Sequence, residues 1–247
     1  MIRIVLGNVG SGKTATMVRE LIKNDSGRVT YSNIKTPHIK NNVEITREML
    51  VKTEQIGMRK NGEPIIKYSF NADFWKDAIK KHGAINVVID EAHTVLSSRT
   101  SMSKQNRIMT DFLALLRRIL GSNDAGHGEL TLITQLDRRL DVIAREMATQ
   151  VRFNVCHFRK RCKSCGHSWT ENNEVPEQQY LCTACGSAKI IKCDHVIEVW
   201  HFPNMTAYQA WREFGDKRYH RHYFVTDIEK YFKFYDTYQW ESLLSEL

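Results

Sequence analysis

Prolines are few in this sequence, and long apolar runs are missing. The 247 residues include 4 prolines, 42% hydrophobic residues and 26% charged residues, a composition that excludes a disordered or fibrous chain. No apolar run approaches the roughly 18 residues of a transmembrane helix. The apolar start at residues 2–6 is too short for the core of a signal peptide. We therefore expect a cytoplasmic protein without membrane insertion, built as one large domain or as one domain with a small insert.

Acidic residues are outnumbered by basic ones. The chain has 36 Lys and Arg against 28 Asp and Glu, which gives a formal net charge of +8. A basic balance favours a polyanionic partner such as nucleic acid without establishing one.

Cysteines are scarce, and four of the six form two C-x-x-C pairs. Cys162-x-x-Cys165 and Cys182-x-x-Cys185 are separated by 16 residues, which fits a zinc pattern. Gly166 and Gly186 follow the second cysteine of each pair, where glycine allows a tight turn around a metal. The sequence therefore predicts a closed, structural Zn²⁺ site with four thiolates. A disulfide or a redox pair is the weaker alternative, because two matched pairs need one common explanation.

Short apolar segments alternate with amphipathic ones over the first 150 residues. This alternation predicts an α/β fold with a mainly parallel sheet covered on both faces. The expected strands are 2–6, 28–31, 85–89 and 130–134, and the expected helices are 13–24, 71–81, 102–120 and 137–148. Two further patterns predict hairpins: 51–58 with 65–70, and 151–158 with 195–202, the second carrying the metal module at its tip.

A glycine-rich segment follows the first expected strand. Residues Gly7-Asn8-Val9-Gly10-Ser11-Gly12-Lys13-Thr14 match G-x-x-x-x-G-K-[ST] in full. Its glycines let backbone N–H groups turn toward phosphate oxygens, and the following helix offers its positive N-terminus to the same anion. Lys13 is expected to reach the β- and γ-phosphates of ATP, and the Thr14 hydroxyl to ligate Mg²⁺. The alternative is a glycine-rich turn that binds nothing, which the flanking strand and helix disfavour.

An acidic pair follows the expected strand 85–89. Asp90 and Glu91 would lie at the carboxyl edge of the sheet, where ligands bind in such folds. We expect Asp90 to hold Mg²⁺ through its water shell and Glu91 to polarise the attacking water as a general base. The alternative is a strand end with two solvated acids. Residues 90–93 also spell a helicase tetrapeptide, but the chain has no room for a second helicase lobe, so we interpret His93 as incidental or as a helix-start residue near the site.

Gln135 ends the fourth expected strand. A polar residue at that point would lie between the two motif strands and face the γ-phosphate. Gln135 is therefore a candidate sensor of the phosphate or of the attacking water. The alternative is an amide that satisfies a local loop.

Basic residues flank the predicted metal module. They are Arg145, Arg152, Arg159, Lys160, Arg161 and Lys163. Such a cluster could follow a phosphate backbone or form a solvated surface, and both interpretations stay open here. Further on, Tyr208, Trp211 and Phe214 recur at helical spacing, which favours a packed helix face over a base-stacking platform.

The order of these motifs resembles the Zot-like branch of the FtsK/HerA superfamily. The resemblance rests on the N-terminal glycine-rich loop, on residues 87–93, on 132–135 with 137–145 after it, and on the closing segment 231–238. It covers about residues 1–158 and, more weakly, 195–240. The branch includes morphogenesis ATPases of filamentous phages and genome-packaging ATPases of some archaeal viruses.

The resemblance implies a RecA-like core, a homo-oligomeric ring and ATP-driven movement of DNA. By position it assigns nucleotide and catalytic roles to Lys13, Thr14, Asp90, Glu91 and Gln135, and it adds a catalytic arginine at Arg145. Phage members usually carry a membrane span. Its absence here favours packaging or translocation over secretion.

The sequence therefore predicts a Mg²⁺-dependent ATPase that moves double-stranded DNA as an oligomeric motor in viral genome packaging. Its cofactors would be ATP, Mg²⁺ and Zn²⁺, with a capsid or portal protein as a further partner. The expected parts are an ATPase core over 1–158, a zinc-ribbon insertion over 159–194, and a return strand with an aromatic, basic segment over 195–247. The alternative is a nucleotide-switched adaptor that uses the zinc ribbon to dock proteins.

Overall fold

One nine-stranded sheet organises the chain. The computed structural model describes residues 1–97, 104–115, 120, 122–123, 126–172, 180–219 and 221–236. The sheet runs in the order β13-β12-β10-β1-β9-β6-β2-β3, and β11 pairs with β10 beside this path. Its strands are β1 (Ile2–Leu6), β2 (Val29–Ser32), β3 (Asn42–Glu44), β6 (Ile85–Ile89), β9 (Leu130–Ile133), β10 (Gln150–Cys162), β11 (Ser168–Asn172), β12 (Ile190–Phe202) and β13 (Arg221–Val225).

The remaining elements are helices and two short hairpins. The helices are α1 (Lys13–Lys23), α2 (Arg47–Leu50), α3 (Ala72–His82), α4 (Lys104–Ala114), α6 (Val142–Glu146) and α7 (Met205–Phe214). Single 3₁₀ segments cover Ala92–Thr94, Asp137–Arg139 and Ile228–Phe234. The hairpins are β4 (Val51–Met58) with β5 (Pro64–Phe70), and β7 (Ser122–Asn123) with β8 (Gly126–His127). No helix in this described part is long and apolar enough to cross a membrane.

The central strands are parallel. β1 pairs in parallel with both β10 and β9, and β9 continues through β6 and β2 to β3 in the same direction. The predicted α/β fold with a mainly parallel sheet is therefore confirmed. β9 lies between β1 and β6, which brings the three predicted motifs to one edge, because parallel strands end on the same side.

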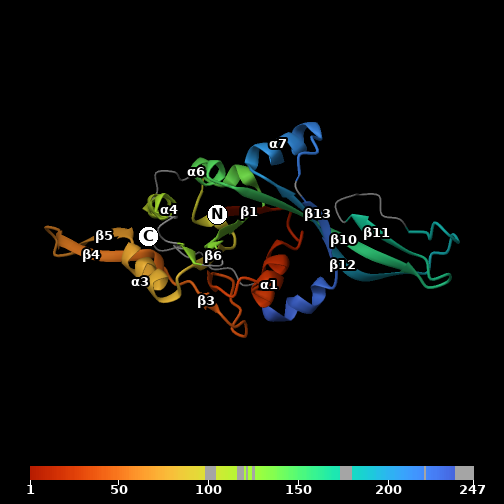
Figure 1. Ribbon diagram of the computed structural model, residues 1–247, viewed down its shortest axis with the longest axis horizontal. Helices are drawn as coiled ribbons and strands as arrows, with labels where there is room; N and C mark the ends of the chain where they lie inside the picture. The colour runs from red at the N-terminus through yellow and green to blue at the C-terminus, as the bar shows by residue number, and fades with distance from the viewer. Residues whose placement is uncertain are drawn as a thin grey trace.

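Both faces of this sheet are covered. One face packs against α3, α4, α6 and α7, with Trp75 and Phe112 fully buried between the layers. The other face packs against α1 and the 3₁₀ segment at 228–234 (Figure 1). The even and odd positions of β1 divide between the two clusters, as expected for a strand buried on both faces.

Two antiparallel extensions leave the body at opposite ends of its long axis (Figure 1). At one end the β4–β5 hairpin projects past α3. At the other, β10 and β12 are both 13 residues long, pair over most of their length and run out of the core together. The predicted strand pair with the cysteine module at its tip is therefore present, with β11 added along β10.

The expected helix over 137–148 is wrong as a single element. Leu140 is fully buried in an extended conformation and makes an isolated bridge with Ser97. Asp141 then starts a new helix, because its side chain accepts a hydrogen bond from the Ile143 N–H at 2.9 Å. The chain is therefore a 3₁₀ turn followed by the short α6.

Two other helix expectations need adjustment. α4 covers Lys104–Ala114, within the expected helix 102–120. Residues 98–103, 116–119 and 121, in or next to that expected helix, lie outside the described residues. On α7, Tyr208 is buried as the spacing predicts, but Phe214 in its last turn is 81% exposed.

Candidate functional site

The glycine-rich turn 7–12 joins β1 to α1. Gly7 (φ 149°) and Gly12 (φ 80°) take backbone conformations that side chains rarely adopt. A Cβ at Gly7 would lie 2.5 Å from the carbonyl oxygen of Asn154, and one at Gly12 would lie 2.5 Å from Cδ1 of Ile197. The turn is thus pressed against β10 and β12, and only glycine fits at these two positions. Asn8, Gly10 and Ser11 complete the same turn, as the motif predicts.

Lys13 folds back onto this turn. Its Nζ donates to the carbonyl oxygens of Gly7 and Asn8, both at 2.8 Å. Burial lowers the pKa of Lys13, while Glu91 and Asp90 act in the opposite direction. A cation held at the mouth of the loop by backbone oxygens is placed to exchange them for phosphate oxygens.

Thr14 and Asp90 meet across the carboxyl edge of the sheet. The Thr14 hydroxyl donates to Oδ2 of Asp90 at 2.7 Å. Burial raises the pKa of Asp90, as does the negative charge of Glu91, and the hydrogen bond from Thr14 opposes this. A nearby cation would offset the cost of burying the carboxylate charge.

Asn33, directly after β2, fixes the backbone of Asp90. The Asp90 N–H donates to Oδ1 of Asn33 at 2.6 Å, and Nδ2 of Asn33 donates to the Asp90 carbonyl oxygen at 2.9 Å. These two hydrogen bonds from the Asn33 side chain hold the end of β6 in one orientation. Sequence reasoning missed Asn33, although a polar residue following a buried strand at the same edge was an available signal.

Glu91 is held in an unusual conformation beside a histidine. Its backbone is left-handed (φ 51°), and its Oε2 lies 3.3 Å from Nδ1 of His93. The same Nδ1 lies 3.3 Å from the hydroxyl of Thr134, which is fully buried at the end of β9. His93 is therefore a neighbour of the predicted base and not an incidental residue, and burial lowers its pKa. Sequence reasoning also missed Thr134.

Gln135 follows Thr134 and lines a pocket of about 440 Å³ with Asn8. Tyr208 and Arg212 of α7 line this pocket, and Arg138 lines it as well. Gln135 thus lies two residues after β9, the strand between β1 and β6, and shares this pocket with Asn8 of the glycine-rich loop. Its role as a sensor stays a prediction.

Arg145 lies in the last turn of α6, where the chain returns toward the start of β10. Within the described part of the chain, no hydrogen bond or ion pair joins Arg145 to the glycine-rich loop. Its catalytic role stays a prediction.

These residues fit a magnesium nucleotide. Magnesium prefers oxygen ligands, and the Thr14 hydroxyl and Asp90 carboxylate supply two of them side by side. The glycine cradle and Lys13 supply backbone donors and a cation for phosphate groups. The donor set therefore matches the chemistry of ATP with Mg²⁺, with Glu91 and Gln135 at the same edge.

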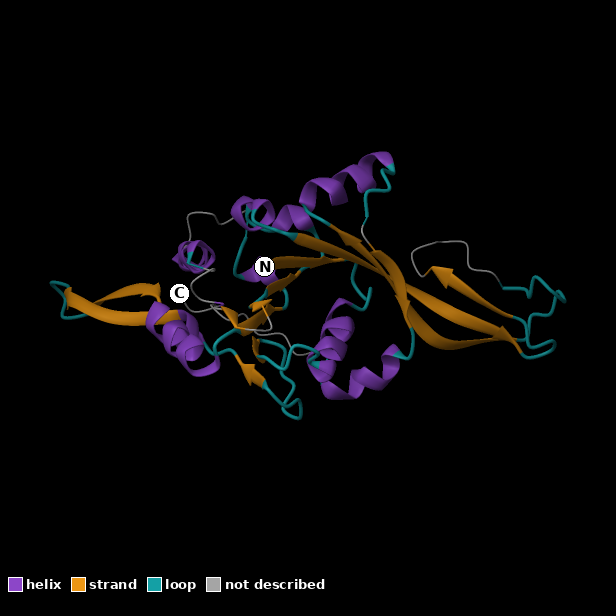
Figure 2. Cartoon of the chain, in the orientation of Figure 1, coloured by secondary structure: helices purple, strands orange, loops and turns teal. Residues whose placement is uncertain are grey.

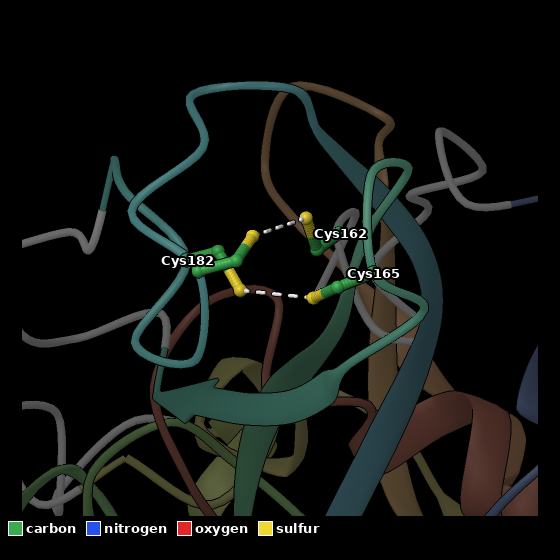
Figure 3. Close-up of side chains that lie close together, drawn as sticks. Cys162, Cys165 and Cys182 are labelled. Carbon is green, nitrogen blue, oxygen red and sulfur yellow. Dashed lines mark hydrogen bonds between the residues drawn. The ribbon is translucent and has the colours of Figure 1, made fainter.

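A second candidate site lies at the tip of the extension formed by β10 and β12. The sulfur atoms of Cys162, Cys165, Cys182 and Cys185 all lie within 4.8 Å of one another. The pairs Cys162–Cys185 and Cys165–Cys182 are each 3.6 Å apart, and Figure 3 shows the labelled sulfurs turned toward one another.

This spacing fits a tetrahedral zinc site. Zn–S bonds of about 2.3 Å separate the sulfurs of a tetrahedron by about 3.8 Å. The backbone N–H of Cys165, with further hydrogen bonds, lowers the pKa of Cys162 to about 6. Cys193 is exposed and lies outside the cluster. Nδ1 of His195 lies 2.6 Å from Oε1 of Glu229. Cys156 is buried in the core, as its alternation in the strand predicts.

Comparisons with known proteins identify the family. A family model described as zonular occludens toxin (Zot) matches residues 1–166, which is two thirds of the chain. The chain therefore belongs to the zonular occludens toxin family, and the predicted resemblance to Zot-like proteins is confirmed. A search of curated proteins finds no match.

Solved structures with a similar arrangement share little sequence with the chain. The N-terminal domain of zonular occludens toxin from Neisseria meningitidis is 16% identical, with 95% of this chain and 98% of that one covered and a TM-score of 0.48. The genome packaging NTPase B204 from Sulfolobus turreted icosahedral virus 2, in complex with AMPPCP, is 19% identical, with 62% and 73% covered and a TM-score of 0.38.

Proposed function

We propose that this member of the zonular occludens toxin family is a Mg²⁺-dependent ATPase that moves double-stranded DNA as a homo-oligomeric ring. One observation carries the ATPase assignment. The Thr14 hydroxyl and the Asp90 carboxylate come from segments 76 residues apart and lie 2.7 Å from each other beside Lys13.

Each side chain at this edge has a separate task. Lys13 and the N–H groups of the turn 7–12 bind and orient the phosphates. Glu91 accepts a proton from the attacking water, and His93 holds the Glu91 carboxylate in place. Gln135 orients the water or responds to the γ-phosphate from the neighbouring strand.

Thr14 and Asp90 would hold the magnesium ion. When bound, the ion supplies positive charge that stabilises the phosphate oxygens during transfer. Asn33 contributes indirectly, because it fixes the backbone from which the Asp90 side chain projects.

The proposed movement of DNA rests on two observations. The Zot-like resemblance implies such a motor, and the net charge of +8 suits a polyanionic partner. A ring, a cytoplasmic location, a role in viral genome packaging and a capsid or portal partner extend the same proposal. Arg145 would act on the nucleotide of a neighbouring subunit in the ring.

The four cysteines would bind Zn²⁺ and close the tip of a zinc ribbon. We propose the boundaries 1–158 and 195–247 for the ATPase core and 159–194 for the ribbon inserted into it. The metal would stabilise a tip whose described side chains are mostly exposed, with Cys162 and Cys182 as its buried residues.

Hydrolysis of ATP by the purified protein, with and without double-stranded DNA, tests the proposal. We expect stimulation by DNA that declines with added salt, and loss of turnover in Glu91→Gln while ATP still binds. Hydrolysis that ignores DNA at every salt concentration would contradict the motor.

The second candidate function is a nucleotide-switched adaptor. Tyr180 and Leu181 are 74% and 56% exposed next to Cys182 and would suit a protein contact at the ribbon. This function predicts turnover that is independent of DNA, and protein partners whose binding changes with the nucleotide.

A further inference from the structure

The outer part of the zinc-bearing extension has two different sides. We call residues 158–172 and 180–195 the arm; they comprise the outer halves of β10 and β12, with β11 alongside and the cysteine loops at the tip (Figure 2). Residues directly opposite each other in antiparallel strands project to the same side. The pairing of Lys160 with both Trp169 and Lys192, and of Arg161 with both Ser168 and Ile191, defines the two sides.

On the side that carries Lys160, both lysines interact with side chains of the arm itself. Lys160 Nζ lies 2.6 Å from Oε2 of Glu171, and Nε1 of Trp169 donates to Oε1 of the same carboxylate at 2.6 Å. Lys192 lies over the ring of Phe158, with its Nζ 2.9 Å from the centroid. Lys160 and Lys192 therefore both have partners within the arm.

The opposite side keeps its positive charge available. Arg159 and Arg161 project from it, and Lys163 and Lys189 lie beyond the strand ends, joined by a backbone hydrogen bond of 2.8 Å. We call these four residues the basic row. Within the described residues its one acidic partner is Asp194, which lies 3.4 Å from Arg159. Residues 173–179, with two glutamates, lie outside the described part.

Hydroxyl groups accompany the row. Ser168 pairs with Arg161 and Thr170 with Arg159, and both are exposed on the same side. A Cβ at Gly166 would lie 4.0 Å from Nη2 of Arg161, so this guanidinium reaches over the first cysteine turn. The guanidinium and hydroxyl groups on this exposed side, together with the two exposed lysines at the end of the strands, are the kinds of donor that contact phosphates in protein–DNA complexes.

We propose that the basic row binds the phosphate backbone of double-stranded DNA, which makes the arm the DNA contact of the proposed motor. The inference rests on the proposed function. Backbone contacts of this kind are independent of base sequence, as a translocating enzyme requires. The same strands pass the glycine-rich turn at Asn154 and Ile197, so DNA on the arm is joined to the nucleotide site by continuous sheet.

A matched pair of charge reversals on the full chain tests the assignment. The arm variant is Arg161→Glu with Lys163→Glu, and the control is Lys60→Glu with Lys67→Glu on the exposed β4–β5 hairpin. Both remove the same amount of positive charge. The readouts are binding of random-sequence duplex DNA over a range of salt, hydrolysis of ATP without DNA, and zinc bound per chain.

We expect the arm variant to bind duplex DNA at least about tenfold more weakly near 0.1 M salt, with the slope of log affinity against log salt reduced by about 2. The control should bind like the unaltered chain. Zinc content and DNA-independent hydrolysis should stay unchanged in both, which excludes misfolding of the arm as the cause.

Three results would overturn the inference. If the arm variant binds duplex DNA as tightly as the unaltered chain, the row does not hold DNA, although the motor proposal survives. If the control loses as much affinity as the arm variant, only the overall charge matters. If polyglutamate displaces the duplex from the unaltered chain at equal charge concentration, the row is a site for acidic protein. A chain that hydrolyses ATP but binds no DNA would remove the motor proposal itself.

Discussion

Thr14 and Asp90 are joined by a hydrogen bond of 2.7 Å between the first helix turn after β1 and the end of β6. Burial raises the pKa of the Asp90 carboxyl, so its ionised form depends on a compensating positive charge. The hydrogen bonds from the Thr14 hydroxyl and the Glu91 N–H and the charge of Lys13 all lower this pKa. The contact therefore links the two halves of the nucleotide site at a buried carboxylate.

Replacing Asp90 with Asn should raise the magnesium concentration needed for half-maximal hydrolysis. The amide keeps the size of the carboxylate but loses the charge that attracts the ion. A titration of ATPase activity with MgCl₂ measures the shift. Asp25→Asn, in the loop after α1, is the control and should titrate like the unaltered chain. Equal magnesium dependence for Asp90→Asn and the unaltered chain would remove Asp90 from the metal site.

Glu91→Gln should reduce turnover by a factor of about 10² to 10⁴ while preserving ATP binding. An amide at this position cannot accept the proton of the attacking water. Single-turnover hydrolysis and equilibrium binding of a fluorescent ATP analogue separate the two effects. Glu54→Gln on the exposed β4 strand serves as the control. A variant that loses binding and turnover together would argue for a structural role of Glu91.

Asn33→Ala should impair hydrolysis through the backbone of Asp90. The change leaves the Asp90 N–H and carbonyl without their partners, at a cost of about 1–3 kcal/mol. We expect a lower kcat. We also expect that MgCl₂ raises the unfolding temperature of this variant less than that of the unaltered chain, as measured by thermal unfolding with and without MgCl₂. Asn86→Ala is the comparison, because the Asn86 amide donates to Ser26 at 3.5 Å and accepts from the Glu129 N–H at 3.2 Å, both away from Asp90. Similar behaviour of both variants would contradict a positioning role for Asn33.

His93 should make the protein less stable at mildly acidic pH. Burial lowers its pKa in the folded state, so the unfolded chain takes up the proton more readily and stability falls as pH drops below about 6.5. Urea unfolding at pH 7.5, 6 and 5 measures this loss, which should be smaller in His93→Gln. Exposed His38→Gln should leave the pH profile unchanged. An identical acid loss in His93→Gln would show that other groups cause it.

Removal of zinc should unfold the tip of the arm and leave the nucleotide site intact. We expect one zinc ion per chain, lost on treatment with a chelator and absent in Cys182→Ser, because four thiolates within 4.8 Å cannot be held together without a metal or disulfides. Metal analysis and limited proteolysis report the two effects. Cys193→Ser should retain the metal. Full zinc binding by Cys182→Ser would place the ion elsewhere.

The motifs of the site could be located from the sequence, whereas several residues that contact them in the fold could not. Regular apolar strands, the glycine spacing and the paired C-x-x-C motifs are local patterns, and each has one simple structural solution. The order of strands then brings Asp90 beside Thr14 and Gln135 to the same pocket as Asn8. Asn33, His93 and Thr134 could not be assigned in the same way, because their roles depend on which strand ends become neighbours.

The break in the expected helix 137–148 has a similar origin. Its residues have helical spacing, but Leu140 is drawn into the core in an extended conformation and Asp141 caps the short helix α6. Tertiary packing therefore overrides the local helical preference of this segment. The spacing predicts Phe214 on the packed face, but as the last residue of α7 its side chain is 81% exposed.

The close approach of Gly12 to Ile197 has a mechanical consequence. β12 runs without a break from Ile197 at this contact to Ile190 at the cysteine loops, and at about 3.3 Å per residue this stretch spans roughly 23 Å. From Ile197 onward β12 is paired on both edges, with β10 and β13, whereas its outer stretch is paired with β10. The arm is therefore a lever anchored in the sheet beside the glycine-rich turn, and a sideways load on the cysteine loops would be carried along β12 to its contact with Gly12.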